Sequence, residues 1–570
     1  MLRMILSRPE RIADCMNRGW WGRRTIDEVF RDAVRASGAV VALVDPPNRD
    51  ALVGSPPRRL TFAELDAEVD RLAALLLALG CRKDDVVAVQ LPNIAEAAVV
   101  FLACARLGLV FCPIAIQFRA HELSYLLAKS RARVAITVER MRDAPYVERF
   151  LELRRSIPTL EHVLVVGGGT AIAFTPRGSD MPSIDPAALG NYLSGLVVDA
   201  NDTLTLCWTS GTEARPKGVP RHHNHWIANG EACSEIGQVR PGEAILNPFP
   251  MINTASIGGM VMPWLMNRAR LVQHHPFDLG VFLAQVAGER IVYTVAPPAI
   301  LSQLLKNEEI LKSTDISALR VLGSGSAPLA PWMVEGWQTR FGIAIVNIFG
   351  SNEGCALFGT GEDLPDPHAR AQVFPRFGVP GIEWATRFAR KVRTRLVDLD
   401  TGEEITTAGR PGELRVDGAM RFDGYWDEPE LSRAAFDEAG YFRSGDLFEL
   451  AGPGAVPPYY RFIGRAKDII IRGGMKISPA ELDSMVEGHP AIREAAFCAV
   501  PDPILGERVG IVAVPKPGQQ VTLEAVIAYL RALDVATFKL PELLRLASEL
   551  PRNSLGKVLR RDLPALFEVG

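Results

Sequence analysis

The stretch LTLCWTSGTEARPKGV, residues 204–219, is the most informative segment of this 570-residue sequence. Its first five residues form a largely apolar run that predicts a short buried strand. The loop after it places hydroxyl groups and a glycine at the strand end, from Thr209 to Thr212, and Lys217 follows. Backbone N–H groups and hydroxyls there can surround polyphosphate oxygens, and lysine adds a compact positive charge. The spacing is not that of a Walker A loop, and spacing alone leaves a phosphate loop and a plain surface turn equally open.

The composition is that of a globular chain with more than one domain. The length exceeds a single ordinary core, with 48% hydrophobic and 23% charged residues. A net charge of −3 argues against a nucleic-acid partner, which would need clustered Lys and Arg. The eight cysteines form no C-x-x-C pair, which disfavours structural zinc and predicts buried thiols in a reducing compartment. No signal segment and no uninterrupted apolar span are visible, so we expect a cytoplasmic protein without an integral membrane span.

Helix and strand signals alternate through most of the chain. Thr61 and Glu64 form a capping box, apolar residues then recur every three or four positions, and Gly80 ends the predicted helix. A βαβ unit follows, with a strand, a helix and a strand expected at 86–91, 95–107 and 109–116. The same order recurs around further strands expected at 204–208, 291–295, 319–323 and 343–349. This pattern predicts an α/β body.

The pattern changes after about residue 460. Ser478 to Glu481 reads as a second capping box, with proline at the first helical position. Strands over 495–500 and 509–514 and a helix from Thr522 are expected after it. These short elements predict a small α+β domain over residues 465–570, behind a large body over residues 1–464.

Five further segments follow the loop at 204–219, and each would be weak evidence alone. They are GSGSAPL at 323–329, FGSNEG at 349–354, YFRSGD at 441–446, GRAKDI at 464–469 with GGMK at 473–476, and PRNSLGKVLRR at 551–561. Glycines in the first allow a flat base to approach the backbone closely. A carboxylate such as Glu353 can hold Mg²⁺ against phosphates, and one such as Asp446 can accept both ribose hydroxyls.

In this order and at these distances, the six segments resemble the motifs of the adenylate-forming superfamily. That superfamily includes acyl-CoA synthetases, luciferases and the adenylation domains of peptide synthetases. The chain departs from the usual pattern at Glu213 and Ala214 in the loop and at Asn352, where threonine is usual. The resemblance implies an acyl-CoA synthetase-like fold: a large, multi-subdomain N-terminal α/β body and a small, mobile α+β C-terminal domain. It also implies a hinge near Lys467.

The resemblance implies a role for each matching residue. Lys557 and Glu353 are the expected catalytic residues, with Glu353 also holding magnesium through the phosphates, and Lys467 is the hinge. The expected ATP and AMP ligands are Thr209, Ser210, Gly211, Thr212, Lys217, Gly325, Ser326, Ala327, Pro328, Asn347, Phe349, Gly350, Ser351, Asn352, Asp446 and Arg465. The expected tunnel for coenzyme A runs past Gly473 and Gly474. The expected acyl pocket contains Met251, Asn253, Gly258 and Gly323.

The implied reaction joins a carboxylic acid to ATP with Mg²⁺ and passes the acyl group to coenzyme A. Small and apolar residues around Gly258 suggest an uncharged, hydrophobic acid, such as a medium-chain fatty, alicyclic or steroid side-chain acid. The partners expected are therefore a small-molecule acid and coenzyme A, and the sequence leaves a homodimer open. His222, His223 and His225 lack the spacing of a zinc site and are expected to begin the helix after the loop.

Three other functions share parts of this pattern. A stand-alone adenylation enzyme that charges a carrier protein would carry every motif. A luciferase-type oxygenase would share the first half-reaction. A binding or scaffold protein with a degenerate site is permitted by the departures at Glu213, Ala214 and Asn352, but Lys217 and Lys557 argue against it.

Overall fold

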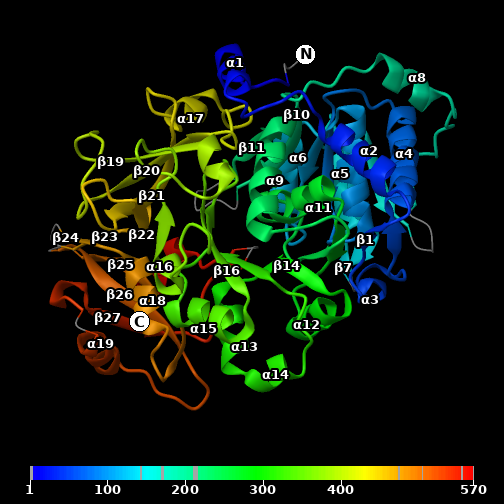
Figure 1. The fold of residues 1–570 in the computed structure, drawn as a ribbon. Coiled ribbons are helices and arrows are strands. Elements are labelled where there is room, and N and C mark those ends of the chain that lie inside the picture. The colour runs from blue at the N-terminus through cyan, green and yellow to red at the C-terminus, as the bar shows by residue number, and fades with distance from the viewer. Residues whose placement is uncertain are drawn as a thin grey trace.

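The computed structural model describes residues 4–141, 144–167, 173–209, 216–472, 475–502, 505–533, 535–553 and 556–568. Two large, mostly parallel sheets form the core of the body (Figure 1). The first has seven strands, in the spatial order β11 (Gly218–His222), β10 (Thr203–Trp208), β4 (Val110–Pro113), β3 (Val86–Gln90), β5 (Val134–Val138), β8 (His162–Val166) and β9 (Phe174–Arg177). Its two edge strands, β11 and β9, are antiparallel to their neighbours.

The second sheet has eight strands, of which the inner six are parallel. Their order is β17 (Ala356–Gly359), β16 (Ala344–Gly350), β15 (Val321–Gly325), β14 (Ile291–Val295), β12 (Ala244–Asn247), β13 (Arg270–Gln273), β1 (Val41–Val44) and β2 (Arg59–Thr61). Parallel strands need crossover connections, and helices supply them. The alternating pattern of the sequence is thereby confirmed as α/β.

Helices fill the space between the sheets and cover their outer faces. In chain order the body contains α1 (Pro9–Asn17), α2 (Ile26–Ser37), α3 (Arg49–Val53), α4 (Phe62–Ala78), α5 (Ala95–Leu107), α6 (Ala120–Ser130), α7 (Val147–Arg154), α8 (Ala188–Gly195), α9 (His223–Gly237), α10 (Thr254–Ser256), α11 (Met262–Asn267), α12 (Leu279–Gly288), α13 (Pro298–Lys306), α14 (Glu308–Lys312), α15 (Pro331–Phe341), α16 (Pro367–Gln372) and α17 (Pro429–Ala434). The predicted helix at 95–107 is confirmed as α5, and the predicted capping box opens α4.

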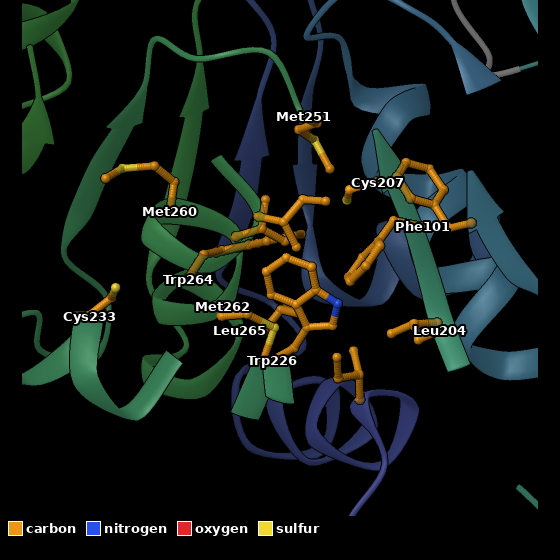
Figure 2. Packing of buried hydrophobic residues seen from close by; sticks show 14 of the residues in the cluster. Phe101, Leu204, Cys207, Trp226, Cys233, Met251, Met260, Met262, Trp264 and Leu265 are labelled. Carbon is orange, nitrogen blue, oxygen red and sulfur yellow. The ribbon is translucent and has the colours of Figure 1, made fainter. Parts of the chain in front are cut away.

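One continuous core joins both sheets through these helices. All thirteen residues of α5 are buried, which is the pattern of a helix surrounded by protein. Figure 2 shows Trp226 of α9 in the middle of this core, with Phe101 of α5 and Trp264 of α11 beside it. The Trp226 indole N–H donates to the Thr205 hydroxyl at 3.0 Å, so its polar edge is satisfied inside the core. The body is therefore a rigid platform for whatever lies at its strand ends.

A third, antiparallel sheet completes the body. Its order is β18 (Val373–Pro375), β22 (Tyr459–Arg465), β21 (Phe442–Ala451), β20 (Pro411–Gly418) and β19 (Val392–Val397). The chain leaves this sheet at Arg465, passes through a single 3₁₀ turn over Ala466–Asp468, and enters a fourth sheet at Ile470. The residues expected to form the hinge therefore lie in the short connection between two sheets.

The fourth sheet forms the small C-terminal domain, which packs below the third sheet in Figure 1. Its strands and helices are β23 (Ile470–Arg472), β24 (Met475–Ile477), α18 (Pro479–Val486), β25 (Ile492–Asp502), β26 (Gly506–Pro515), α19 (Leu523–Ala532), β27 (Leu543–Leu546) and α20 (Ala565–Glu568). It has its own apolar core. The predicted α+β composition of this region is confirmed.

Some expected details differ from the structure. The strand expected at 319–323 is β15, Val321–Gly325, because the amide of Leu319 donates to Ile316 in a turn that delays the strand. Ser478 caps α18 through the amide of Glu481, but the second half of the expected capping box is replaced. The Glu481 carboxylate instead binds the Lys539 ammonium at 2.8 Å.

All eight cysteines are free and buried, as the sequence predicts, and burial raises the pKa of Cys207 to about 12. Among the described residues, no helix combines the length and the apolar character that crossing a bilayer requires.

A buried ion cluster anchors α5 and yields a stability prediction. Arg49 contacts Glu96 at 2.7 Å and Asp45 at 3.1 Å, all three side chains are fully buried, and Asp45 accepts the amide of Ala95 at 2.7 Å. Replacing Arg49 by Met leaves the buried Asp45 carboxylate without its cation and Glu96 with Arg58 alone, which costs about 3–5 kcal/mol. We expect the guanidinium chloride concentration at the midpoint of unfolding, followed by tryptophan fluorescence, to be well below that of the control Arg35→Met, which changes an exposed arginine. Equal midpoints for the two variants would contradict this role.

Candidate active site

The predicted phosphate loop leaves β10 and returns at β11, and its two ends are tied together. The amide of Thr209 donates to the Lys217 carbonyl at 2.9 Å, and the amide of Lys217 donates to the Thr209 hydroxyl at 3.0 Å. A Cβ at Gly218 would meet Leu206 and Trp426 at 3.0 Å, so a side chain where β11 begins would be tightly packed. The predicted ligands Ser210, Gly211 and Thr212 lie outside the described residues.

Lys217 and Glu353, far apart in sequence, meet at Tyr425. The Lys217 ammonium lies 5.2 Å from the centre of the Tyr425 ring, within the range of a cation–π contact. The Tyr425 hydroxyl donates to Glu353 Oε1 at 3.1 Å. The structure therefore brings together the cation expected to bind phosphates and the carboxylate expected to hold magnesium.

A tight turn after β16 carries Glu353. The amide of Ser351 donates to the Cys355 carbonyl at 2.9 Å, and Gly354 has a φ of 86°, where its Cβ would lie 1.8 Å from the Met420 carbonyl oxygen. Any side chain at Gly354 would displace the turn. Arg221, which is buried, donates to the carbonyl of Asn352 at 2.7 Å. The turn is held from both sides.

Asn352 links this turn to two other parts of the site. Its Oδ1 accepts the amide of Thr254 at 3.0 Å, and its Nδ2 donates to the carbonyl of Trp208 at 3.4 Å. Because the Thr254 amide can only donate and the Trp208 carbonyl can only accept, the orientation of the side-chain amide is set. Asn352, which stands where threonine is usual, thus joins the start of the phosphate loop to residues 251–267, which carry most of the predicted acyl pocket and are called the acyl segment below.

The predicted adenine-binding residues lie at the ends of β15 and β16. A Cβ at Gly325 would lie 2.0 Å from the Ile348 carbonyl, so the two strands approach more closely than any side chain allows. Ser326 has a φ of 70°, a strained value of the kind that clusters at functional sites. Ser326, Ala327 and Pro328 are exposed, and with Gly325 they form an open edge.

Asn347, Phe349 and Gly350 belong to the same strand end. The Asn347 side chain is buried and donates to the carbonyl of Arg370 at 3.0 Å, which is a structural contact. The half-buried Phe349 ring lies against Phe448, with the ring centres 5.1 Å apart. Phe349 keeps part of its surface accessible for a base.

The predicted ribose ligand and its neighbours sit on adjacent strands. Asp446 and Arg465 are register partners on β21 and β22, with Arg465 Nε 3.4 Å from Asp446 Oδ1. Burial raises the pKa of Asp446 to about 6, against the opposing effects of Arg465 and Lys557. Asp446 is only 7% exposed, so its carboxylate is one of the few buried acids of the site.

Lys557 reaches this pair from the C-terminal domain. Its amide donates to Asn553 Oδ1 at 2.9 Å and its carbonyl accepts the Asn553 amide at 2.8 Å, which forms a narrow turn. The residue is exposed as a whole, yet burial of its ammonium end and repulsion from Arg465 lower the pKa of Lys557 to about 8, despite attraction to Asp446. Lys557 is therefore near enough to Arg465 and Asp446 for their charges to act on its ammonium group.

The predicted hinge and tunnel residues fall between β22 and β24 in the chain. Lys467 is exposed in the 3₁₀ turn between the third and fourth sheets. Gly473 and Gly474 lie outside the described residues. Nearby in the chain, Ile471 and Met475 are apolar and about half exposed, at 51% and 46%, whereas Arg472, directly before Gly473, binds Glu542 at 2.7 Å.

The acyl segment combines three short helical turns. Asn253 caps α10, and Gly258 lies in a π-helical turn over Ile257–Val261, a feature that is frequent at functional sites. A Cβ at Gly258 would lie 1.8 Å from Asn229 Oδ1, which explains why glycine is present. Met251 and Gly323 are buried, and Met251 is packed into the main core.

The residues present fit magnesium bound with a nucleotide. Mg²⁺ prefers oxygen ligands and is usually held by one or two carboxylates together with phosphates. Glu353 offers such a carboxylate, and next to it the buried Ser351 hydroxyl has no hydrogen-bond partner within the described chain. Both are consistent with a site completed by ligand oxygens.

A second group of potential metal ligands is His222, His225 and Asp423. Each histidine Nδ1 accepts the backbone amide of the other residue, at 3.2 and 3.4 Å, in a reciprocal cap of α9. Neutral rings that accept at Nδ1 carry their proton at Nε2, the atom a metal would need. Arg11 also lies 2.7 Å from Asp423, which opposes a cation. We interpret the group as a buried cap, and the expectation that these histidines begin the helix is confirmed.

Sequence reasoning missed Tyr425, Arg221 and Thr254. Each contacts a predicted residue from a distant segment, so no local motif marks it. The available signal was the group of aromatic residues Phe422, Tyr425 and Trp426 in the connection between β20 and α17.

The chain was compared with known proteins. A family model described as AMP-binding enzyme matches residues 41–426, and one described as AMP-binding enzyme C-terminal domain matches residues 481–557. A medium-chain fatty-acid–CoA ligase of Escherichia coli (strain K12) is 29% identical over 97% of this chain and 93% of its own length. A salicylyl-CoA synthase / salicylate adenylyltransferase of a Streptomyces species is 29% identical over 96% of this chain and 94% of its own.

Among solved structures, ATP-bound MatB from Rhodopseudomonas palustris superposes with a TM-score of 0.76 at 23% identity. The match covers 96% of this chain and 99% of the other, so both the body and the small domain share that fold. The chain belongs to the AMP-binding enzyme family, within the adenylate-forming superfamily, and is an AMP-forming acid–thiol ligase.

The two shifted pKa values predict the pH dependence of kcat/KM for ATP. Below about pH 6 Asp446 takes up a proton, and above about pH 8 Lys557 loses one, so we expect a bell-shaped profile between them. Arginine stays protonated above pH 12, so Lys557→Arg should lose the alkaline limb, and Asp446→Asn the acid limb. The pH profile of the wild-type enzyme, measured with the same nucleotide, is the control for both variants. An unchanged alkaline limb in Lys557→Arg would refute the assignment.

Proposed function

We propose that this enzyme condenses a carboxylic acid with ATP to give an acyl-adenylate and pyrophosphate. It then transfers the acyl group to the thiol of coenzyme A and releases AMP. The observation that carries the proposal is that Lys557, from the small domain, lies within electrostatic range of Asp446 and Arg465, which form an ion pair in the body. A cation from one domain at a ribose-binding pair of the other is the arrangement that the first half-reaction needs.

The first half-reaction must overcome repulsion between two anions. The carboxylate attacks the α-phosphorus in line, and pre-arranged positive charge lowers the barrier because it is already oriented before the reaction. Lys557 bridges the attacking carboxylate and the α-phosphate, while Lys217 holds the departing pyrophosphate. Glu353 would hold Mg²⁺, which would supply further positive charge to the departing group.

Asp446 and Arg465 orient the nucleotide for this attack. An ionised Asp446 accepts both ribose hydroxyls, and Arg465 keeps that carboxylate in place from the neighbouring strand. The open edge at Gly325–Pro328 receives the adenine, with the accessible face of Phe349 next to it. The hydroxyl of Ser351 and the side-chain amide of Asn352 donate to the phosphates once the nucleotide is bound.

The second half-reaction needs a different arrangement. The acyl-adenylate is already activated, so thiol attack needs little acid–base help, and Lys557 would obstruct it. We propose that the small domain rotates about Lys467, which withdraws Lys557 and brings the Gly473–Gly474 edge to the site. The exposed apolar side chains of Ile471 and Met475 beside that edge suit the pantetheine arm of coenzyme A.

The acid is proposed to be uncharged and hydrophobic. Ile257, Met260 and Met262 follow Asn253 in the acyl segment and offer no charged group to a substrate. The fatty-acid ligase among the relatives supports a medium-chain acid, and the salicylate enzyme supports an aromatic acid as the second candidate. A panel of fatty, alicyclic, aromatic and steroid side-chain acids, tested by acid-dependent exchange of pyrophosphate into ATP, decides between them.

The acceptor is tested separately. Acid-dependent exchange without any CoA-dependent release of AMP would favour a carrier protein as the thiol acceptor instead. Absence of exchange with every acid would overturn the proposal as a whole.

The buried free cysteines support a reducing, cytoplasmic setting for the enzyme.

Lys557→Ala separates the two half-reactions. Loss of one electrostatic catalytic donor costs about two or more decades in rate, so we expect that loss in adenylate formation, measured by pyrophosphate exchange. Thioester formation from supplied acyl-adenylate should stay nearly unchanged. Lys516→Ala, which removes another exposed lysine of the same domain, is the control. Comparable losses in both half-reactions would refute the role.

Gly474→Leu gives the opposite division. A bulky side chain in the proposed tunnel should slow CoA-dependent release of AMP by about tenfold or more, the scale of a misplaced reactant. Pyrophosphate exchange should be spared. Gly190→Leu, at an exposed glycine of α8 with open space around it, is the matched control. Equal damage to exchange would count against the tunnel.

A further inference from the structure

The turn over residues 422–426 contacts two charged side chains expected to act on the triphosphate, Lys217 and Glu353. It follows β20 and precedes α17 in the chain. It lies against Gly218, at the end of the phosphate loop, and against the turn that carries Glu353. None of its residues belongs to a segment that marked the site in the sequence. Its contacts suggest that it sets the geometry of the charges around it.

Glu353 is held by this turn at two points. The amide of Phe422 donates to the Glu353 carbonyl at 2.8 Å, and the Tyr425 hydroxyl donates to Glu353 Oε1 at 3.1 Å. The first contact places the backbone of Glu353. The second sets the rotation of the carboxylate and therefore the direction of its other oxygen.

Lys217, the lysine expected to bind phosphates, is held by the same turn. The Lys217 ammonium lies over the Tyr425 ring at 5.2 Å, and the amide of Trp426 donates to the Gly218 carbonyl at 2.9 Å. One aromatic side chain thus touches both the cation and the carboxylate. The separation of Lys217 and Glu353 is determined by the dimensions of that side chain.

The turn itself is well anchored. The amide of Tyr425 donates to the Ser432 hydroxyl at 2.9 Å, and the indole N–H of Trp426 donates to the Lys129 carbonyl at 3.2 Å. Gly424 has a φ of 143°, and a Cβ there would lie 2.9 Å from the Ser432 hydroxyl. The Phe422 and Tyr425 rings pack edge to face, with centres 4.9 Å apart. These contacts leave the Tyr425 ring little freedom.

We infer that Tyr425 is a positioning residue that orients the Glu353 carboxylate toward the metal of the metal–nucleotide complex and supports Lys217 on its ring. A group held in the right direction before binding costs no reorganisation when the ligand arrives. The inference rests on the proposed function, because it assigns Glu353 and Lys217 to the nucleotide. The two contacts of Tyr425 have different roles. Its hydroxyl orients the carboxylate that would bind the metal, and its ring supports the lysine that would bind phosphate.

The test uses the whole protein and a non-reacting nucleotide, the α,β-methylene analogue of ATP, titrated calorimetrically with and without Mg²⁺. Tyr425→Phe removes the hydroxyl and keeps the ring. We expect about tenfold weaker binding of the magnesium complex, the scale of a hydrogen bond to a charged group, with metal-free affinity unchanged. Tyr425→Leu should in addition weaken metal-free binding about threefold, the scale of a cation–π contact. Tyr192→Phe, which removes a half-buried hydroxyl on α8, is the control.

A double-mutant cycle with Glu353→Gln shows whether the hydroxyl acts through Glu353. If it does, Tyr425→Phe should have no further effect on the magnesium complex once Glu353 is replaced. Equal weakening with and without Mg²⁺, an additive cycle, or wild-type affinity in Tyr425→Phe would each overturn the inference. A wild-type protein that binds the analogue in neither form would instead overturn the proposed function, and this inference with it.

Discussion

The candidate site depends on an electrostatic balance between Lys557, Arg465 and Asp446. The charge of Arg465 lowers the pKa of Lys557, whereas the buried Asp446 carboxylate raises it and so offsets part of the repulsion between the two cations. Arg465 and Asp446 are partners in one sheet of the body, whereas Lys557 comes from the other domain. In the proposed mechanism the lysine contributes only when the domains are in this arrangement, so that the same interaction would couple adenylate formation to domain position.

The rest of the body holds its own charged site residues, such as Lys217 and Glu353, in place. Two parallel sheets with a buried helix between them bring the ends of β10, β15 and β16 to one region. Glycines at the closest approaches, such as Gly325 and Gly354, let backbone meet backbone where a Cβ would collide. On this frame Tyr425 contacts both Lys217 and Glu353.

Asn352 illustrates how a departure from a family pattern is accommodated. A threonine has one hydroxyl, whereas an asparagine amide accepts and donates at separate atoms. In this chain it spans the Thr254 amide and the Trp208 carbonyl, so that the acyl segment and the phosphate loop share one side chain. The change therefore alters how the two halves of the site are connected, while the carboxylate beside it keeps its place.

Local patterns in the sequence determined the elements, the order of the motifs and the α/β class, because capping boxes, apolar periodicity and glycines act over a few residues. They were sufficient for α5, for β14 and for the type of the small domain. Only the tertiary structure decided that Tyr425 touches both Lys217 and Glu353, that Arg221 supports the turn at Asn352, and that Met251 belongs to the core. These contacts join residues separated by tens to hundreds of positions, and no local preference encodes which distant segments will meet when the core packs.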